Sequence, residues 1–316
     1  MIVLGGIWLV FGNEKEQSVV AEKRISFISP MANSGYWGNV AGGIWDMGAA
    51  SEMDVKCVGF SELNQEKQIY ALENAVMSDV DGIITVAYEN LLEFRKIVEE
   101  AQEAGIPVIF IDSDVKDAGR LCYIGSDNFR AGQLAGEKLA TECGGRGKVA
   151  IITSFSDNAN QKERISGFKD ALKNFPDMEI VSVMEGQSNT GLIREMVAKV
   201  LEDMPQINAI FCTEGYGSGA VCEMSEKNRE QFKKIKIVVF DYNEKIKHAI
   251  ASGSIVGTIR QNPYDMGSKA VRVLQTYFAG NQEKIRDQYT DIELVTAENE
   301  MKSEYGERED IVWHIY

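Results

Sequence analysis

Ten side chains in this 316-residue sequence could bind a small polar molecule, and each follows the end of a short apolar run. Carboxylates, amides and guanidinium groups can bind hydroxyl groups in pairs, and flat rings can cover the apolar face of a pyranose. The combination predicts a site for a small polyhydroxy ligand. The candidates are Asn33, Tyr36, Trp37, Tyr88 and Asp112 in the first half and Asn160, Arg164, Glu214, Asp241 and Gln261 in the second.

Helix capping is the competing explanation for many of these residues. Asp, Asn and Ser cap helices and populate turns wherever a strand meets a helix, and this alone could explain about half of the polar residues at the strand ends. Capping does not explain Arg164, Gln261, Tyr36 and Trp37. These four therefore carry the interpretation as a binding site.

The sequence has few residues of the types that catalysis or metal binding would use. The two histidines, His248 and His314, have no nucleophile near them in the sequence. This pattern does not favour acid–base or nucleophilic catalysis. It does not favour a metal enzyme either. We expect a protein that is not an enzyme and needs no cofactor or metal.

A nucleotide-dependent enzyme is the strongest alternative, because Gly215–Ala220 fits the spacing G-x-G-x-x-A after a strand and Asp241 lies one strand later. Glu214, however, would repel a pyrophosphate, and the motif falls late in the chain. The glycine-rich stretch Gly144–Lys148 precedes its strand and is too short for a phosphate loop. It is more typical of a turn that ends a helix.

Composition excludes further classes. A formal net charge of −15 disfavours nucleic-acid binding, and residues 1–23 are too short and too apolar for the basic helix-turn-helix of a repressor. The five cysteines are odd in number and lack a C-x-x-C pair, so neither a zinc site nor a disulfide framework is indicated. Cys57 and Cys212 lie in apolar runs, where we expect them to be buried.

The N-terminal segment, residues 1–22, is expected to be a signal-like or anchor segment. Met1–Gly12 is nearly all apolar, too short for an ordinary membrane span, and similar to the apolar centre of a signal peptide. No basic segment precedes it and no lipid-attachment cysteine follows it. Either the true start lies upstream, or the segment is a short uncleaved anchor; a buried first strand is the remaining alternative. We expect an extracytoplasmic monomer that meets the membrane only through this segment.

The elements that would position the candidates alternate between strands and helices. Continuously apolar runs are typical of strands covered on both faces in a parallel sheet. Glu89–Ala104 predicts a helix that ends at Gly105, and Gly191–Asp203 predicts another with Thr190 as its N-cap. The predicted strands are Ile25–Ser29, Val55–Phe60, Gly82–Ala87, Pro107–Asp112, Cys122–Gly125, Lys148–Thr153, Glu179–Met184, Ala209–Thr213, Lys236–Asp241, Ile255–Ile259 and Ile292–Thr296.

This alternation occurs roughly four times on each side of Asp127, which predicts an α/β fold of two similar doubly wound parallel-sheet lobes. In such sheets a ligand binds beyond the carboxyl ends of the strands. The candidate side chains stand at those ends, so the fold and the proposed site support each other.

Seven motifs, taken together, resemble one family. They are Arg24–Ser29 followed by an Asn-x-x-aromatic-aromatic loop, Asp81-Gly-Ile-Ile, Gly105-Ile-Pro-Val-Ile-Phe-Ile-Asp112-Ser113, Ile124-Gly-Ser-Asp-Asn128, Gln161-x-x-Arg164-x-x-Gly167-Phe168, Val238-Val-Phe-Asp241 and Thr258-Ile-Arg-Gln261. From about Arg24 to about Asn299 the sequence resembles the ribose- and galactose-type periplasmic sugar-binding proteins, which serve ABC-type importers.

The resemblance implies the type I periplasmic binding protein fold, with a three-segment hinge near 126–128, 261–263 and 292–295. Lobe 1 would comprise 23–126 plus 263–291, and lobe 2 would comprise 127–262 plus 292–316. The lobes would close on a ligand, expected to be a neutral sugar, and deliver it to an ABC permease and its ATPase. The alternative is a sugar-sensing receptor domain that feeds a histidine kinase or chemoreceptor.

The resemblance also implies roles for single residues. Asn33, Tyr36 and Trp37 would contact and stack on the ligand, and Asp112 would bind its hydroxyl groups. Arg164, Asp241 and Gln261 would do so from lobe 2 and the hinge. Glu214 stands where the family commonly has asparagine, so it would either select a neutral or amino-bearing ligand, or cap a helix or face solvent.

Overall fold

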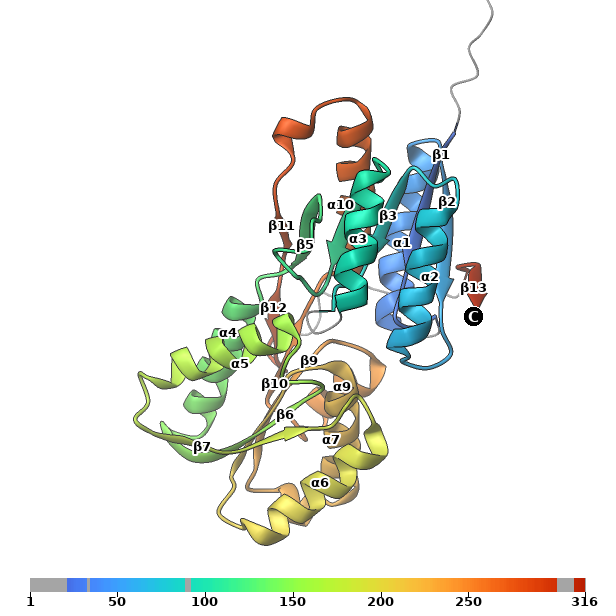
Figure 1. The fold of residues 1–316 in the computed structure, drawn as a ribbon. Coiled ribbons are helices and arrows are strands. Elements are labelled where there is room, and N and C mark those ends of the chain that lie inside the picture. Colours follow the sequence, from blue (N-terminus) through green and yellow to red (C-terminus); the bar gives the residue numbers. More distant parts are fainter. Residues whose placement is uncertain (1–21, 33–34, 89–91, 300–309, 316) are drawn as a thin grey trace, which may run out of the picture.

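The computed structural model describes residues 22–32, 35–88, 92–299 and 310–315. Strands and helices alternate along the chain and form two lobes, each built on its own sheet (Figure 1). Both sheets are covered by helices on their two faces. The predicted α/β class with two similar doubly wound lobes is confirmed.

The first sheet is parallel throughout and has the strand order β11-β5-β4-β3-β1-β2-β13. One face packs against α1 and α10, and the other face packs against α2 and α3. The strands are β1 (Lys23–Ile28), β2 (Met53–Gly59), β3 (Gly82–Thr85), β4 (Val108–Ile111), β5 (Cys122–Ser126), β11 (Gln288–Thr290) and β13 (Trp313–Ile315); the helices are α1 (Gly35–Ala50), α2 (Gln65–Met77), α3 (Leu92–Glu103) and α10 (Pro263–Phe278), followed by the 3-10 turn η1 (Gln282–Lys284).

The second sheet has the order β12-β10-β9-β8-β6-β7, and only the pair β10–β12 is antiparallel. Helices α4 and α5 cover one face, while α6, α7 and α9 cover the other. The strands are β6 (Arg146–Thr153), β7 (Asp177–Glu185), β8 (Ala209–Cys212), β9 (Lys236–Phe240), β10 (Gly257–Arg260) and β12 (Glu293–Val295); the helices are α4 (Asn128–Glu142), α5 (Ala159–Leu172), α6 (Thr190–Asp203), α7 (Gly215–Lys227), α8 (Arg229–Phe232) and α9 (Glu244–Ala251).

The apolar runs form the central strands because each side of a central strand must bury against a helix layer. In β9, the four residues from Ile237 to Phe240 have no exposed surface. The lobes share one strand order, β2-β1-β3-β4-β5 in the first and β7-β6-β8-β9-β10 in the second. Corresponding strands therefore occupy the same places in the two sheets.

Two predicted helix ends can be compared with the structure. Gly105 follows α3 with φ of 76°, a left-handed conformation that glycine adopts without a steric penalty, so the predicted helix end is confirmed. The predicted cap of α6 is wrong. Thr190 is the first helical residue, and the cap is Asn189, whose side chain accepts a hydrogen bond from the backbone N–H of Leu192 at 3.0 Å.

The chain passes between the two sheets at three connections in the described residues. They join β5 to α4, β10 to α10, and β11 to β12. The placement of 292–316 in lobe 2 is wrong at its end, because β13 pairs with β2 in the first sheet. Trp313 lies against Phe27, with ring centroids 6.2 Å apart, and this apolar contact holds the strand there.

All five cysteines are free thiols, and Cys57 and Cys212 are buried as expected. Among the described residues, no helix combines the length and the apolar character that crossing a membrane requires. Residues 1–21 lie outside the described part of the chain, so the signal or anchor segment at 1–22 stays a prediction.

Candidate ligand-binding site

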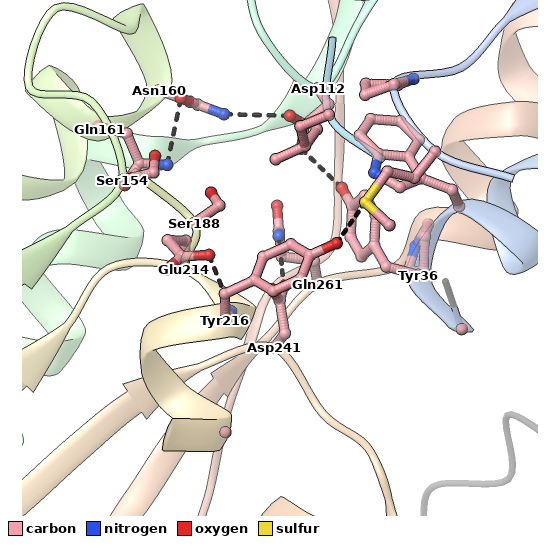
Figure 2. Close-up of a pocket in the computed structure, with 18 of the residues that line it drawn as sticks. Tyr36, Asp112, Ser154, Asn160, Gln161, Ser188, Glu214, Tyr216, Asp241 and Gln261 are labelled. Carbon is pink, nitrogen blue, oxygen red and sulfur yellow. Dashed lines mark hydrogen bonds between the residues drawn. The ribbon is translucent and has the colours of Figure 1, made fainter. Parts of the chain in front are cut away.

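A cleft of about 1220 Å³ lies between the carboxyl ends of the two sheets (Figure 2). Nine of the ten candidate side chains line it; Asn33 lies outside the described residues. The structure therefore brings together residues that are up to 225 positions apart in sequence, from Tyr36 to Gln261. That they bind a ligand stays a prediction.

Asp112 links the two lobes. It follows β4 with φ of 66°, and its carboxylate accepts one hydrogen bond from the Tyr36 hydroxyl at 2.7 Å and another from Asn160 Nδ2 at 3.0 Å. Tyr36 belongs to α1 in the first lobe, whereas Asn160 belongs to α5 in the second. Burial raises the pKa of Asp112, against the opposing effect of the Arg164 charge. Two neutral donors thus orient a desolvated carboxylate toward the cleft.

Asp241 and Gln261 form a matching pair in the second lobe. Gln261 Nε2 donates to Asp241 Oδ1 at 2.7 Å, and Gln261 Oε1 accepts from Ser126 Oγ at 2.8 Å and from Arg164 at 3.2 Å. These contacts fix which end of the amide is the oxygen. Ser126 is the last residue of β5 and Gln261 directly follows β10, so the two lie at different connections between the sheets and this amide joins the hinge to the cleft.

Arg164 is 2% exposed and is tied to the hinge as well as to the cleft. Its Nε donates to Asn128 Oδ1 at 2.8 Å, and Nη1 donates to the carbonyl oxygen of Thr213 at 2.7 Å. The guanidinium lies over the Phe240 ring, 3.8 Å from its centroid. These contacts use three of its five N–H groups, counting the one to Gln261, and hold the remaining edge in a fixed orientation.

Glu214 is the N-cap of α7. It is 8% exposed, and its carboxylate accepts hydrogen bonds from the backbone N–H groups of Tyr216 at 2.8 Å and Gly217 at 2.6 Å. Burial raises the pKa of Glu214 to about 7, although these two hydrogen bonds lower it. Of the alternatives that the sequence left open for this residue, the helix cap is confirmed. Glu214 also lines the cleft, so capping and ligand contact are compatible (Figure 2).

The same cap bears on the nucleotide alternative. A phosphate at the start of α7 would need the backbone N–H groups of the first turn. Glu214 already accepts hydrogen bonds from two of them, at Tyr216 and Gly217. The spacing of Gly215–Ala220 therefore belongs to a capped helix here, which disfavours a dinucleotide site.

The aromatic candidates lie on the wall that the first lobe contributes. Tyr36 and Trp37 meet edge to face, with ring centroids 5.0 Å apart and planes at 86°. Tyr88 packs edge to face on Phe94 at 6.0 Å, and its hydroxyl donates to Gln68. Tyr88 thus offers mainly its ring to the cleft, because its hydroxyl already has a partner.

Several residues of the cleft were not among the candidates. Gln161 bonds to Thr153, Thr213 and Asn160, and so positions Asn160. Its place beside Asn160 in the sequence was a usable signal. Tyr216 donates from its hydroxyl to Met31 Sδ across the cleft (Figure 2), but a lone Met in a loop or a lone Tyr at the start of a helix gives no comparable signal. Ser154 and Ser188 also line the cleft.

Among the described residues, no three His, Cys, Asp or Glu side chains are grouped so that they could hold a metal ion. The cleft has the features of a hydrogen-bonding site: paired acceptors, paired donors and aromatic walls. It can bind hydroxyl groups from both lobes at once.

Comparisons with known proteins agree with this geometry. The family model of the periplasmic binding protein domain matches residues 25–282. The D-ribose/D-allose-binding protein of Pseudomonas aeruginosa is 27% identical over 246 residues, which cover 75% of this chain and 76% of that protein. The ribose import binding protein of Salmonella typhimurium is 26% identical over 200 residues, which cover 63% of this chain and 66% of that protein.

Two solved structures have the same fold. The glucose-galactose binding protein from Geobacillus stearothermophilus has a TM-score of 0.84 and 28% identity, covering 89% of this chain and 99% of its own. An ABC transporter solute-binding protein from Burkholderia graminis, in complex with D-arabinose, has a TM-score of 0.83 and 26% identity, covering 89% and 97%. On the family match, which spans most of the sequence, the chain belongs to the periplasmic binding protein family.

Proposed function

We propose that this protein captures a sugar between its two lobes and delivers it to the permease of an ABC importer, which is driven by its ATPase. The single observation that carries the proposal is the convergence of Asp112 from one lobe with Arg164 and Asp241 from the other on one cleft. The relatives support it, because those compared above bind sugars, one is an import binding protein by name and another is an ABC transporter solute-binding protein. These names favour transport over sensing.

The division into lobes is part of the proposal. One lobe comprises 23–126, 263–291 and the strand 313–315, and the other comprises 127–262 and 292–299. The sheet membership of the strands and the three connections support these boundaries. The hinge segments meet where Arg164 bonds to Asn128 and Gln261, so the cleft and the hinge share side chains.

The lobes close around the ligand, because side chains of both lobes bind it and the ligand stabilises the closed arrangement. Asp112 and Asn160 already meet across the cleft, and so do Met31 and Tyr216. Tyr36 and Trp37 would cover an apolar ring face, while the aspartates accept hydrogen bonds from hydroxyl groups. Gln261, which Arg164 holds, orients Asp241, and Arg164 donates to ring or hydroxyl oxygens.

The protein acts outside the cytoplasm as a monomer, without catalysing a reaction, and meets the membrane only through the segment 1–22 and its permease. The family to which the chain belongs supports the extracytoplasmic part of this proposal. Deleting the permease gene and measuring uptake of the bound sugar would test the transport role.

The binding role is tested by titration calorimetry with a panel of pentoses and hexoses. At least one sugar should bind with one-to-one stoichiometry and a dissociation constant in the micromolar range or below, which corresponds to roughly −8 kcal/mol or more favourable. If no pentose or hexose produces binding heat at millimolar concentration, the proposed function is wrong.

A further inference from the structure

Three carboxylates and one buried cation meet in the cleft. Glu214 is buried, Asp112 and Asp241 are half-buried, and Arg164 is the buried cation among them. Within the described part of the chain, no salt bridge joins Arg164 to any of these three carboxylates. Each carboxylate is held by uncharged donors instead.

When all four groups are ionised, three negative charges face one positive charge, an excess of two negative charges in a desolvated space. Burial is the largest influence on all three carboxylates and raises the pKa of each. Buried charges in proteins are normally paired. A positive charge on the ligand would balance this excess.

The other cations that line the cleft do not supply this positive charge. Arg194 pairs with Glu223, Arg260 pairs with Glu293, and Lys247 pairs with Glu244. Lys245 and Lys247 are exposed to solvent, where their charges are screened. The charged and titratable groups that act on Glu214 are Arg164 from α5, Asp241 from the end of β9, Cys212 from β8 and Tyr216 from α7.

Glu214 is also fixed in place. Its two hydrogen bonds to the first turn of α7 prevent the side chain from turning away from the cleft. They also occupy backbone N–H groups that an anionic ligand group would otherwise use. A phosphate or carboxylate on the ligand would therefore meet a fixed like charge and lose its natural donor.

We infer that the ligand is a sugar that carries a protonated amino group, and that Glu214 pairs with this ammonium group while the aspartates bind the hydroxyl groups. This inference rests on the proposed function and narrows its ligand class. Glu214 is then the residue that distinguishes the aminated sugar from its neutral parent.

Proton linkage gives the inference a signature of its own. With its pKa near 7, Glu214 of the free protein is partly protonated at neutral pH. An ammonium group favours the ionised form, so binding releases a proton and the affinity rises as pH increases from about 5.5 to about 7. A neutral sugar that accepts a hydrogen bond from protonated Glu214 would show the opposite trend.

The test is titration calorimetry with matched ligands: glucose, glucosamine and glucose 6-phosphate, and galactose with galactosamine. The aminated member should bind at least about tenfold more tightly than its neutral parent, a difference of about 1.4 kcal/mol. Repeating the titration in buffers of different ionisation enthalpy at pH 7 should reveal proton release with the aminated ligand. The sugar phosphate should bind most weakly of the three.

Two variants assign the preference to Glu214. Glu214→Gln and Glu214→Asn should bind the aminated and neutral sugars within about threefold of each other, since both remove the charge. Asn is also an effective N-cap, so the second variant should keep α7 intact if the first melts early. Glu226→Gln, a charge removal on the same helix that does not line the cleft, should keep the wild-type ranking.

Each outcome decides the matter. Equal or tighter binding of the neutral parent, or tightest binding of the phosphate, would overturn the inference and leave the proposed function standing. A preference for the aminated sugar that persists in both Glu214 variants would also overturn it. Absence of binding by every sugar would instead contradict the proposed function itself.

Discussion

Asp112 and Asp241 occupy equivalent positions in the two lobes. Each directly follows the fourth strand of its sheet in a left-handed backbone conformation, with φ of 66° and 68°. The backbone N–H of Asp112 donates to the Ile124 carbonyl at 3.0 Å, and that of Asp241 donates to the Ile259 carbonyl at 2.9 Å. The same strand-end turn therefore presents one carboxylate to the cleft from each side.

The carbonyl groups of the two aspartates are held in the same way. The Tyr123 hydroxyl donates to the carbonyl of Asp112 at 2.9 Å, and the Thr258 hydroxyl donates to that of Asp241 at 2.6 Å. Left-handed backbone is uncommon outside glycine, but Asp and Asn tolerate it. The backbone at these positions therefore suits Gly, Asn or Asp, and of these only Asp supplies a charge.

Asp112→Asn should weaken sugar binding by about 1–3 kcal/mol, because a ligand hydroxyl loses a charged acceptor. Its unfolding free energy should change by less than about 1 kcal/mol, since Asn tolerates the left-handed backbone as Asp does. Calorimetry and denaturant unfolding measure the two quantities. Asp79→Asn, at a side chain 90% exposed, is the control and should change neither. Wild-type affinity in Asp112→Asn would remove Asp112 from the site.

Arg164→Ala should weaken both binding and folding. Truncation leaves Asn128, Gln261 and the Thr213 carbonyl without their buried donor, and each buried polar group left unpaired costs about 1–3 kcal/mol. We therefore expect a loss of at least about 3 kcal/mol in unfolding free energy. Lys169→Ala, at an exposed position of the same helix, should unfold like the wild type. A variant of Arg164 with wild-type stability would show that these contacts do not support the hinge.

Much of the fold could be predicted because the central strands are long apolar runs. Such a run is best buried on both faces in a sheet that helices cover. Ile237 to Phe240 is such a run, and the structure places it at the centre of a sheet. The strands β11 and β13 were missed, because each has only three residues and includes polar ones at a sheet edge. A pattern of that length cannot be distinguished from a loop.

The site could be predicted in position but less well in role. Strand ends meet at one edge of a parallel sheet, so Asp112 and Asp241 could be placed without coordinates. The capping role of Glu214 depends on where α7 begins, and sequence alone leaves helix boundaries uncertain by a few residues. The bonds from Arg164 to the hinge join segments far apart in the chain, and no local pattern encodes them.

Trp313→Ala should lower the unfolding free energy by about 2 kcal/mol, because the half-buried indole packs on Phe27 and beside Gly59. His314→Ala changes the next residue, which is exposed, and should have little effect. Denaturant unfolding of both variants measures the difference. Equal stability of the two would mean that β13 adds nothing to the first lobe.

A variant lacking residues 1–19 should fold and bind sugar like the full chain, because β1 begins at Lys23. Circular dichroism tests the folding of this variant, and calorimetry tests its sugar binding. If the shortened protein is insoluble or binds no sugar, the apolar segment Met1–Gly12 is a structural element and not a signal or anchor.

Closure of the two lobes on a sugar is the central claim, and small-angle X-ray scattering tests it most directly. The radius of gyration should be measured without ligand and at saturation with the sugar that binds most tightly. Because side chains of both lobes bind the ligand, we predict a smaller radius at saturation. An unchanged radius at saturation would contradict the account.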